Sequence, residues 1–385
     1  MNERNKRLPK PRPLIECFEG LPDPRMDRTR RHKLIDIFMI GLCSVLAGGE
    51  NFTDMESFGL ARKDWFATFL ELPNGIPSHD TFRRVFSAID PHVFMDCFCQ
   101  WVRGICPNLG GEVVAIDGKA LRHALSEGEA IPYIVSAWAS DNGLVLGQVK
   151  VNEKSNEITA VPELLDALLL KGAIVTLDAM GCQKNIAARI IGKQADYLLA
   201  LKGNHETVHE EVKVFFHDAV APCATEAATH ARKQLMDFHQ TIEKGHGRIE
   251  TRRYWQSTDI DWFADKQLWK GLKSFGMVES IRKEKGKCAI ERRYYLCSLP
   301  LDAKRFGQAV RGHWGVENNL HWCLDVVFRE DDSRARTKNA AQNMATLRRI
   351  ARNIIKKDSS RKASMRGKRL LAAIDQDFLP HLLGI

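Results

Sequence analysis

Two stretches decide the fold: VVAIDG at residues 113–118 and AIVTLDA at residues 173–179. Each is a short apolar run with β-branched residues that leads into an aspartate, Asp117 in the first and Asp178 in the second. Such runs predict buried strands. A carboxylate where a buried strand ends is poorly hydrated unless it binds a metal ion or accepts hydrogen bonds. Taken singly, each aspartate is more simply a turn or helix cap, but the repetition predicts a site where the two strands end.

The segments around these two strands alternate between strand and helix patterns. Strands are predicted at residues 133–139, 144–151 and 196–201, and helices at residues 160–170 and 184–191. The sequence Asp141-Asn142-Gly143 is a hairpin signal between the first two of these strands. The order strand, strand, strand, helix, strand, helix, strand predicts an α/β layer of the ribonuclease-H-like type.

Helical patterns precede and follow this layer. Helices are predicted at residues 32–46, 52–70, 78–89 and 93–105, and again at residues 303–311, 314–327 and 339–356. Ser78 is expected to cap the helix at 78–89, and Pro91 to stop it. We therefore expect a small all-helical domain over residues 1–108, an α/β domain over residues 109–357 and a basic C-terminal tail over residues 358–385.

Between about residue 203 and residue 300 the α/β pattern is interrupted. A polar helix is predicted at residues 206–219, and apolar residues then alternate with polar ones at 249–255, 275–281 and 292–299. Alternation with a period of two predicts half-buried strands. We expect a mostly β insertion within the α/β domain.

The composition is ordinary for a soluble protein but carries an excess of positive charge. The 385 residues are 44% hydrophobic and 27% charged, with a formal net charge of +9. No apolar stretch reaches the roughly 20 residues of a membrane span, and no apolar run follows the basic N-terminus as it does in a secretory signal. We therefore expect a cytoplasmic protein with no membrane partner. The ten cysteines contain no CxxC pair, which favours reduced thiols over a structural zinc site.

Positive charge is concentrated near the C-terminus. Residues 334–369 contain 13 Lys or Arg residues and a single acid, Asp358. A surface that binds a polyanion such as DNA has this composition. A solvated helix surface is an equally good explanation when the stretch is taken alone.

A third carboxylate comes from HWGVENNLHW at residues 313–322. Val316, Leu320 and Leu324 recur every four residues, so one face of the predicted helix is expected to lie on the sheet. Glu317 lies beside this stripe, with His321 and Asp325 on the same adjoining face, and can reach the two strand-end aspartates. The simple alternative for Glu317 is a surface helix glutamate. The rival third acids are Asp325, Glu330, Asp331 and Asp332.

Three carboxylates are a suitable ligand set for two divalent metal ions. Two Mg2+ ions about 4 Å apart activate the attacking oxygen and stabilise the leaving oxygen in phosphodiester displacement. Hard oxygen ligands favour Mg2+ or Mn2+ over zinc.

At these residues the chain resembles the insertion-sequence DDE transposases, and among them the H-repeat-associated group. The matching segments are AIDGK at 115–119, TLDAM at 176–180, LKGN at 201–204 and HWGVEN at 313–318. The resemblance covers nearly the whole chain, including the helical domain that accompanies the catalytic domain in this group. It implies a ribonuclease-H-like catalytic domain in which Asp117, Asp178 and Glu317 are catalytic and bind two Mg2+ or Mn2+ ions.

One motif of related transposases is missing. They place Tyr, two residues, Arg, three residues, Glu, six residues and Lys around the glutamate. This chain has Val310, His313 and Leu324 at the Tyr, Arg and Lys positions. The candidates for the lost phosphate contacts are Arg311, Lys338 and His313.

Five more residues are candidates for DNA contact. Lys119 follows Asp117 within the first matching segment, and Lys202 and Asn204 follow the strand at 196–201. Arg83 and Arg84 lie on the predicted helix at 78–89, which fits either the second helix of a helix-turn-helix or a packing helix.

The resemblance implies a bacterial, nucleoid-associated enzyme that cleaves mobile-element ends and joins the freed 3′-hydroxyl to target DNA. Its expected partners are double-stranded DNA, as element ends and as target, and a second copy of the chain, because pairing two ends requires at least a dimer. The missing motif leaves open a decayed or domesticated transposase that only binds DNA. A structure-specific nuclease shares the metal chemistry without end recognition.

Overall fold

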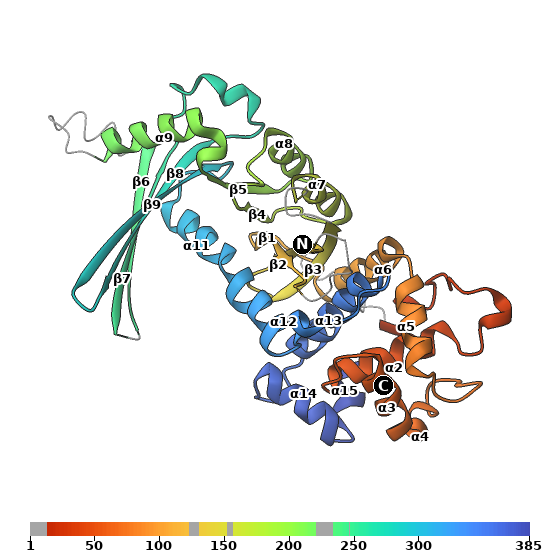
Figure 1. Ribbon diagram of the computed structural model, residues 1–385. Coiled ribbons are helices and arrows are strands. Elements are labelled where there is room, and N and C mark those ends of the chain that lie inside the picture. The colour runs from red at the N-terminus through yellow and green to blue at the C-terminus, as the bar shows by residue number, and fades with distance from the viewer. Residues whose placement is uncertain (1–13, 123–130, 152–156, 221–233, 246) are drawn as a thin grey trace, which may run out of the picture.

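The computed structural model describes residues 14–122, 131–151, 157–220, 234–245 and 247–385 (Figure 1). Its centre is one nine-stranded sheet in the order β3-β2-β1-β4-β5-β9-β8-β7-β6. The strands are β1 Val113–Ala120, β2 Tyr133–Ala139, β3 Leu144–Val151, β4 Ile174–Leu177, β5 Asp196–Leu201, β6 Met236–Gly245, β7 Arg248–Ser257, β8 Ser274–Glu284 and β9 Lys287–Cys297. β1 pairs antiparallel with β2 and parallel with β4, and β4 pairs parallel with β5. The predicted mixed α/β class is confirmed.

β1 is longer than the sequence pattern indicates. It was expected over residues 113–116, but it continues through Asp117 to Ala120 because β2 pairs alongside it as far as Tyr133. The parallel pairing between β1 and β4 stops earlier, at Ile116 opposite Leu177. Asp117 and Asp178 are therefore the first residues beyond the parallel part of two adjacent strands, although only Asp178 lies at a strand end.

The two faces of the central strands pack against different helices. Val113 of β1 and Ile174 of β4 share a buried cluster with Phe306 of helix α11, Ala303–His313. Val114 and Val175 point the other way, into the main core, which also contains residues of α7, Glu157–Ala167, and α8, Lys184–Gly192. Because side chains alternate along a strand, Asp117 lies on the same face as Val113, which is the α11 side.

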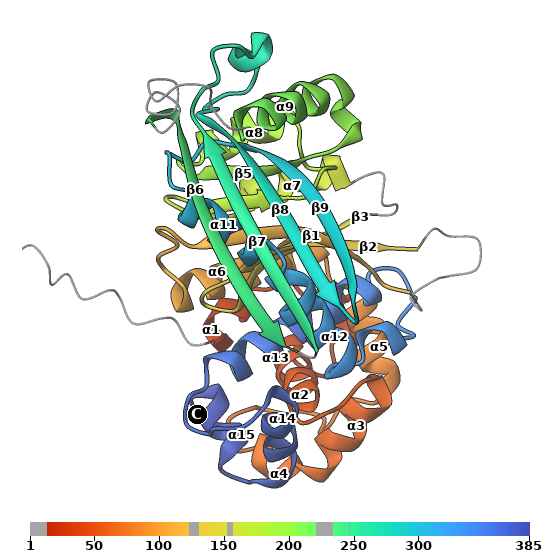
Figure 2. The ribbon, with the colours of Figure 1, turned by 90° about the vertical axis from the view of Figure 1, so that its left-hand side faces the viewer.

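The expected β insertion extends the central sheet. β9 pairs antiparallel with β5, so β6 to β9 continue the sheet beyond its five-stranded part, and Figure 2 shows these long strands crossing the front of the molecule. Three strands were expected and four are present. β6 was not predicted because it is the outer edge strand and none of its residues is buried, so it lacks the apolar signal of a core strand. The expected polar helix is α9, Glu206–Ala219.

The N-terminal region is helical, as expected. Its longer helices are α2 Leu34–Leu46, α3 Phe52–Ala61, α5 His79–Ala88 and α6 Pro91–Ile105. The single helix predicted at 52–70 is divided at Arg62 into α3 and the short α4, Lys63–Phe66. No helix in the part of the chain that the structure describes is long and apolar enough to cross a membrane.

Two expectations about helix ends in this region are wrong. Ser78 occupies the N-cap position of α5 but makes no capping hydrogen bond, and its hydroxyl lies 3.2 Å from that of Thr81 instead. Pro91 does not end α5, which stops at Ala88, but is the first residue of α6, where a missing N–H is harmless. The side chain of Asp90 caps that helix by accepting a hydrogen bond from the His92 amide at 2.9 Å.

Helix α13, Ala340–Lys357, lies between the helical region and the sheet. Of its 18 residues, 15 are buried, and it contacts α2, α5 and α6 on one side and β3 on the other. The side-chain amide of Asn343 donates to the carbonyls of Phe86 and Ile89 at the end of α5. Asn353 forms two hydrogen bonds with the backbone of Val145 in β3. The same helix therefore holds both halves of the molecule.

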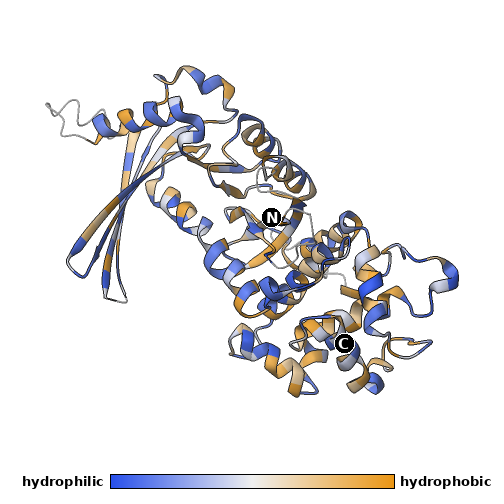
Figure 3. Ribbon diagram, in the orientation of Figure 1, coloured by the Kyte–Doolittle hydropathy of each residue, from blue (hydrophilic) through white to orange (hydrophobic). Residues whose placement is uncertain are grey.

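The basic stretch at 334–369 is not one continuous positive face. Arg348, Arg349, Arg352, Lys368 and Arg369 are all at least 93% buried. Residues 358–385, expected as a basic tail, form α14, Met365–Ile374, and α15, Phe378–Leu383, which pack on α13. Figure 3 shows mixed blue and orange colouring along this region. Composition alone could not separate buried from exposed arginines, because a buried arginine in this chain is satisfied by carbonyls and acids distant in sequence.

Candidate active site

Asp117, Asp178 and Glu317 line one cleft. The cleft has a volume of about 630 Å3 and opens between the central strands, β9 and the segment that follows α11. Asp117 comes from β1, Asp178 from the residue after β4, and Glu317 from the helical segment after α11. Its lining residues are Asp117, Gly118, Thr176, Leu177, Asp178, Leu198, Ala200, Lys202, Arg293, Tyr295, Val310, His313, Trp314, Glu317 and His321.

Glu317 reaches the cleft from a π-helical turn. The turn spans Val316–His321 and is followed by α12, Trp322–Val326. Val316, Leu320 and Leu324 are completely buried, as the four-residue spacing predicted. A π turn is wider than an α turn, so the side-chain directions after it differ from those of a regular helix. His321 lines the cleft with Glu317, whereas Asp325 does not.

The rival third acids lie outside the cleft lining. Asp325, Glu330 and Asp331 surround the ammonium of Lys119 instead, at 2.6, 3.6 and 2.7 Å. Glu330 also forms a fully buried ion pair with Arg349 at 2.7 Å. Asp332 is exposed and pairs with Arg329 at 2.8 Å.

Lys119 therefore differs from its expected role as a DNA contact. Its side chain is only 8% exposed and its ammonium faces three carboxylates. Burial alone lowers the pKa of Lys119, but the adjacent acids more than offset this effect, so its pKa is raised and the residue stays charged. A phosphate of DNA would have to displace these carboxylates to reach it. Lys119 instead ties β1, which carries Asp117, to the segment that follows α12.

The loop after Asp178 is held by local hydrogen bonds. The Asp178 carboxylate accepts from the backbone amides of Met180 at 3.0 Å and Gly181 at 3.3 Å. The Asn204 side-chain amide donates to the Ala179 carbonyl at 2.6 Å, so Asn204, expected to contact DNA, positions this loop. These contacts use one oxygen of Asp178 and leave the carboxylate as part of the cleft lining.

Two histidines at the cleft are uncharged at neutral pH. Burial lowers the pKa of His313 to about 4 despite the nearby Asp178, and its Nδ1 lies 2.9 Å from the hydroxyl of Thr176. Burial also lowers the pKa of His321 to about 4, with Arg349 and Lys119 acting in the same direction. The 3.7 Å approach of His321 to the Asp117 carboxylate is therefore not an ion pair at pH 7. His313 therefore supplies no positive charge to the cleft at neutral pH.

The cationic lining of the cleft comes from other elements. Lys202, which the sequence singled out, lies in the cleft just after β5, and Arg293 of β9 lies there too. Sequence reasoning missed Arg293, since it is one of many basic residues in the insertion and only the pairing of β9 with β5 brings it to the site. The guanidinium of Arg293 lies 4.6 Å from the centroid of the Trp314 ring.

The remaining candidates for DNA contact lie elsewhere. Arg311 pairs with Glu243 of β6 at 3.0 Å and is not part of the cleft lining. Lys338 is exposed and precedes α13. Arg83 and Arg84 are both exposed on α5, in the helical region.

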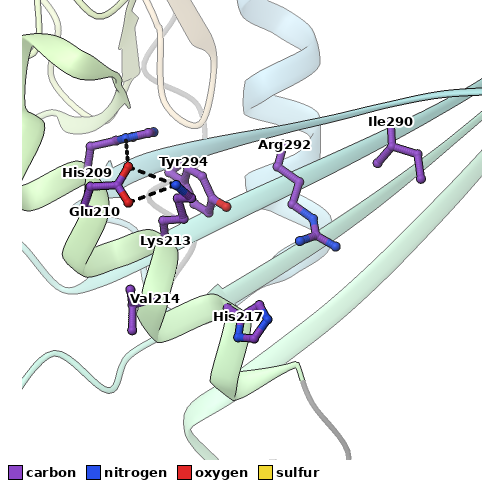
Figure 4. Close-up of a pocket in the computed structure, with 8 residues that line it drawn as sticks. All are labelled: His209, Glu210, Lys213, Val214, His217, Ile290, Arg292 and Tyr294. Atoms are coloured by element: carbon purple, nitrogen blue, oxygen red, sulfur yellow. Dashed lines mark hydrogen bonds and ion pairs between the residues drawn. The ribbon is translucent and has the colours of Figure 1, made fainter.

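A second hollow, between α9 and β9, lacks the features of an active site. Figure 4 shows Glu210 of α9 joined to His209 and Lys213, with Arg292 and Tyr294 on the neighbouring strand. Lys213 lies 2.9 Å from Glu210, in an ion pair that is exposed to solvent. The hollow contains one carboxylate residue where the cleft contains three.

The donor set of the cleft fits a hard divalent cation in its chemistry. Three carboxylates from separate elements line it, and the exposed Glu317 side chain has the freedom to turn toward the other two. Across the described residues, no three His, Cys, Asp or Glu side chains are already close enough together to hold a metal ion. Holding one with all three carboxylates therefore requires Asp117, Asp178 and Glu317 to move closer to each other.

Comparisons with known proteins agree with this geometry. Residues 108–354 match the family described as Transposase DDE domain, and residues 15–102 match the family described as DDE_Tnp_1-associated. The chain belongs to the DDE transposase family. The resemblance inferred from the sequence motifs is confirmed, and DDE transposases in general use divalent metal ions.

Individual relatives are similar over most of the chain. The H repeat-associated putative transposase YhhI of Escherichia coli (strain K12) is 39% identical, over 96% of this chain and 97% of its own length. An uncharacterized protein in the dhlA 3′ region of Xanthobacter autotrophicus is 42% identical, over 77% of this chain and 96% of its own. Among solved structures, the piggyBac transposase synaptic complex with hairpin DNA aligns with a TM-score of 0.46 and 10% identity, covering 96% of this chain and 76% of that chain.

Proposed function

We propose that this DDE transposase cleaves DNA at the ends of its mobile element and joins the freed 3′-hydroxyl to target DNA. The observation that carries the proposal is the meeting of Asp117, Asp178 and Glu317 in one cleft from three separate elements. In this proposal, strands β1 to β5 with α7, α8 and α11 form a ribonuclease-H-like catalytic domain. Residues 1–108 form the accompanying helical domain.

Asp117 and Asp178 are proposed to bind both of two Mg2+ or Mn2+ ions, and Glu317 to bind one of them. When bound, such ions lower the pKa of the attacking water or hydroxyl and stabilise charge on the leaving oxygen. The amides of Met180 and Gly181 hold the Asp178 carboxylate in orientation. Lys119 holds β1, and with it Asp117, in register with α12 and the segment that follows it.

Lys202 and Arg293 are proposed to bind the phosphates that flank the scissile bond. They are the cations of the cleft lining, and they take over the role of the arginine and lysine that the chain lacks around Glu317. Neutral His313 and His321 remain as hydrogen-bonding groups beside the carboxylates. Replacing Arg293 by alanine is expected to reduce cleavage about 10- to 100-fold, since hydrogen bonds to charged groups contribute roughly 1.5–3 kcal/mol.

The test is cleavage and strand transfer on duplex DNA that carries the element's own ends, with Mg2+ or Mn2+ as the added metal. We expect nicks that expose 3′-hydroxyls at the ends, followed by joined products with a target duplex. The active species is expected to contain at least two copies of the chain, measured as the mass of the protein–DNA complex. Specific end binding without any cutting would instead support a decayed or domesticated transposase, the alternative that the missing Tyr, Arg and Lys leave open. Cutting without regard to the ends would support a structure-specific nuclease.

A further inference from the structure

Four arginines line a groove that the proposed chemistry does not use. The groove lies between α5 of the helical region and the segment joining α12 to α13, and has a volume of about 500 Å3. Arg83 comes from α5, and Arg329, Arg334 and Arg336 come from the joining segment. We call these four residues and the hollow between them the arginine groove. Its lining also includes two acids, Glu50 and Asp332, so positive charge predominates.

Two arginines of the groove form ion pairs that are exposed to solvent. Arg83 pairs with Asp80 at 2.8 Å, and both side chains are about half exposed. Arg329 pairs with Asp332 at 2.8 Å, and both are more than half exposed. Exposed pairs of this kind contribute little free energy, typically below about 1 kcal/mol, so a phosphate can replace the carboxylate.

The arginine-bearing segment has a fixed backbone shape. It begins at Arg329, with φ 49°, and ends at Lys338, with φ 46°, and both residues are in the left-handed region that side chains other than glycine rarely adopt. Such strain persists only where surrounding contacts impose it, and it is common at functional sites. Here those contacts include the ion pair between Asp331 and Lys119 at 2.7 Å. They also include the hydrogen bond that the Asn339 side-chain amide donates to the Ile89 carbonyl at 3.1 Å.

The same contacts connect the groove to the catalytic cleft. Lys119 is two residues from Asp117 on β1, and its ammonium binds Asp331 within the segment that forms one wall of the groove. The opposite wall is α5, which α13 fixes through Asn343. The groove is therefore positioned relative to the cleft from both sides and does not depend on a free loop.

We propose that the arginine groove binds the sugar–phosphate backbone of duplex DNA next to the stretch that enters the cleft. This inference rests on the proposed function, because it assigns the groove to the same DNA molecule. Guanidinium groups present planar forks that match phosphate oxygens, and four of them in one groove suit the repeated phosphates of a DNA backbone. The groove contacts phosphates and reads no sequence, since phosphate contacts position a protein on DNA without specifying bases.

The test uses two adjacent arginines of α5. Arg83 lines the groove, whereas Arg84 is also exposed but does not line it. Binding of the full chain to a 40-base-pair duplex is measured by fluorescence anisotropy at a series of salt concentrations, without divalent metal. Arg83→Gln is expected to reduce the slope of log affinity against log salt by about one, as one phosphate contact is lost. Arg84→Gln should keep the wild-type slope.

A second variant tests the opposite wall. Arg334→Gln with Arg336→Gln should reduce the slope by about two and weaken binding on the order of tenfold. Its matched control is Lys270→Gln with Lys273→Gln, which removes two exposed charges from the loop before β8. Melting temperatures within a few degrees of wild type confirm that all variants are folded.

The outcomes separate the groove from the proposed function. If Arg83→Gln and the Arg334/Arg336 variant keep the wild-type slope while their controls do too, the groove does not bind DNA and the inference is overturned. Cleavage of element ends by the wild type with Mg2+ is scored independently. If the variants reduce the salt slope but the wild type never cuts element ends, the groove binds DNA and the proposed catalytic function is wrong.

Discussion

At the scale of single residues, the geometry around the cleft depends most on Lys119. Its ammonium faces Asp325, Glu330 and Asp331 together, and these acids come from a segment about 200 residues later in the chain. A charge that is paired and buried in this way keeps two distant parts of the chain in register. Without the lysine, three carboxylates would be left close together with little water.

Replacing Lys119 by methionine is expected to lower the free energy of unfolding by about 3–5 kcal/mol, since removal of one partner leaves buried charges uncompensated. Urea denaturation followed by circular dichroism measures the change. The matched control is Arg122→Met, because Arg122 approaches the same Asp331 at 3.7 Å but is 74% exposed. Arg122→Met should lower the free energy of unfolding by less than about 1 kcal/mol. Equal effects of the two substitutions would show that Lys119 is not a buried anchor.

The sequence predicted the three carboxylates of the candidate site, but not all of the residues that surround them. Asp117 and Asp178 were singled out as strand-end residues, and the resemblance to the insertion-sequence DDE transposases selected Glu317 among the candidate third acids. The structure brings all three to one cleft. Lys119 was assigned to DNA because it follows Asp117 in the first matching segment. Its acid partners are distant in sequence, so their proximity to Lys119 depends on the fold. Arg293 was missed for the same reason, since it reaches the cleft only through the pairing of β9 with β5.

At the scale of elements, the packing of α11 on the sheet determines one wall of the cleft. Val310 and His313 of α11 line the cleft, and Phe306 on the same helix packs over Gly276 of β8. A side chain at position 276 would overlap the ring of Phe306. The absence of a side chain at Gly276 therefore allows the helix to lie close to the insertion strands.

Gly276→Ala is expected to destabilise the protein by about 1–3 kcal/mol, because an added methyl group in a packed contact forces the helix away. Thermal unfolding measures the effect as a lower Tm. Gly192→Ala is the control, since a Cβ at position 192, at the end of α8, meets nothing within 4 Å. The control should be neutral or stabilising by up to about 1 kcal/mol. A Gly276→Ala protein as stable as wild type would mean that α11 is free to shift.

The C-terminal helices depend on another buried carboxylate, Asp358. Burial alone raises the pKa of Asp358, but hydrogen bonds from Lys368 and Ser360 more than offset this, so its pKa is held well below the ordinary value. A carboxyl group whose pKa is depressed in the folded state stabilises the folded protein at pH values above the pKa of the unfolded chain, which is about 3.9. This stabilisation is lost as the pH falls below that value.

Asp358→Asn is therefore expected to reduce the free energy of unfolding at pH 7 by about 3 kcal/mol, as the Lys368 ammonium loses its buried partner at 2.8 Å. The difference between variant and wild type should shrink as the pH is lowered below about 4, where Asp358 of the unfolded chain is already protonated. Denaturation midpoints between pH 3 and pH 7 measure this. Asp377→Asn, at an exposed position near the start of α15, should change little at any pH. A difference that does not vary with pH would contradict the ion-pair account.

The sequence predicted the strands and helices correctly where one face, or all, of the element is buried. β2, β3 and β5 have the expected bounds, and α2 and α13 are within two residues of them. β6 was missed because an edge strand has no buried face to produce a periodic signal. The π-helical turn at Val316–His321 was not predicted either, since its extra width comes from packing and leaves no mark in residue spacing.

At the scale of the whole molecule, α13 makes the helical region and the sheet one unit. Its two faces are buried against different parts of the chain, and Asn343 and Asn353 fix one part each through backbone carbonyls and amides. The sequence predicted the helix but not this role, because its buried arginines suggested an exposed basic surface. Unfolding of the whole chain is therefore expected to be a single transition.

Asn343→Ala tests this coupling. The substitution removes hydrogen bonds to the carbonyls of Phe86 and Ile89, which are buried at the end of α5, and is expected to cost about 1–3 kcal/mol. Calorimetry should show the whole transition moving to lower temperature without splitting. Gln342→Ala, at the adjacent and less buried position, should have a smaller effect. Two separate transitions would mean that the helical region and the sheet fold independently.

The central claim is that Asp117, Asp178 and Glu317 act together as the catalytic carboxylates. The most direct measurement is metal-dependent cleavage of element-end DNA by wild type and by Asp117→Asn, Asp178→Asn, Glu317→Gln and Asp332→Asn, the last being an exposed rival acid outside the cleft. We predict that the first three variants lose at least about 1,000-fold in rate while still binding DNA, and that Asp332→Asn cuts normally. Wild-type cutting that survives Glu317→Gln, or is lost in Asp332→Asn, would contradict the assignment of the third carboxylate.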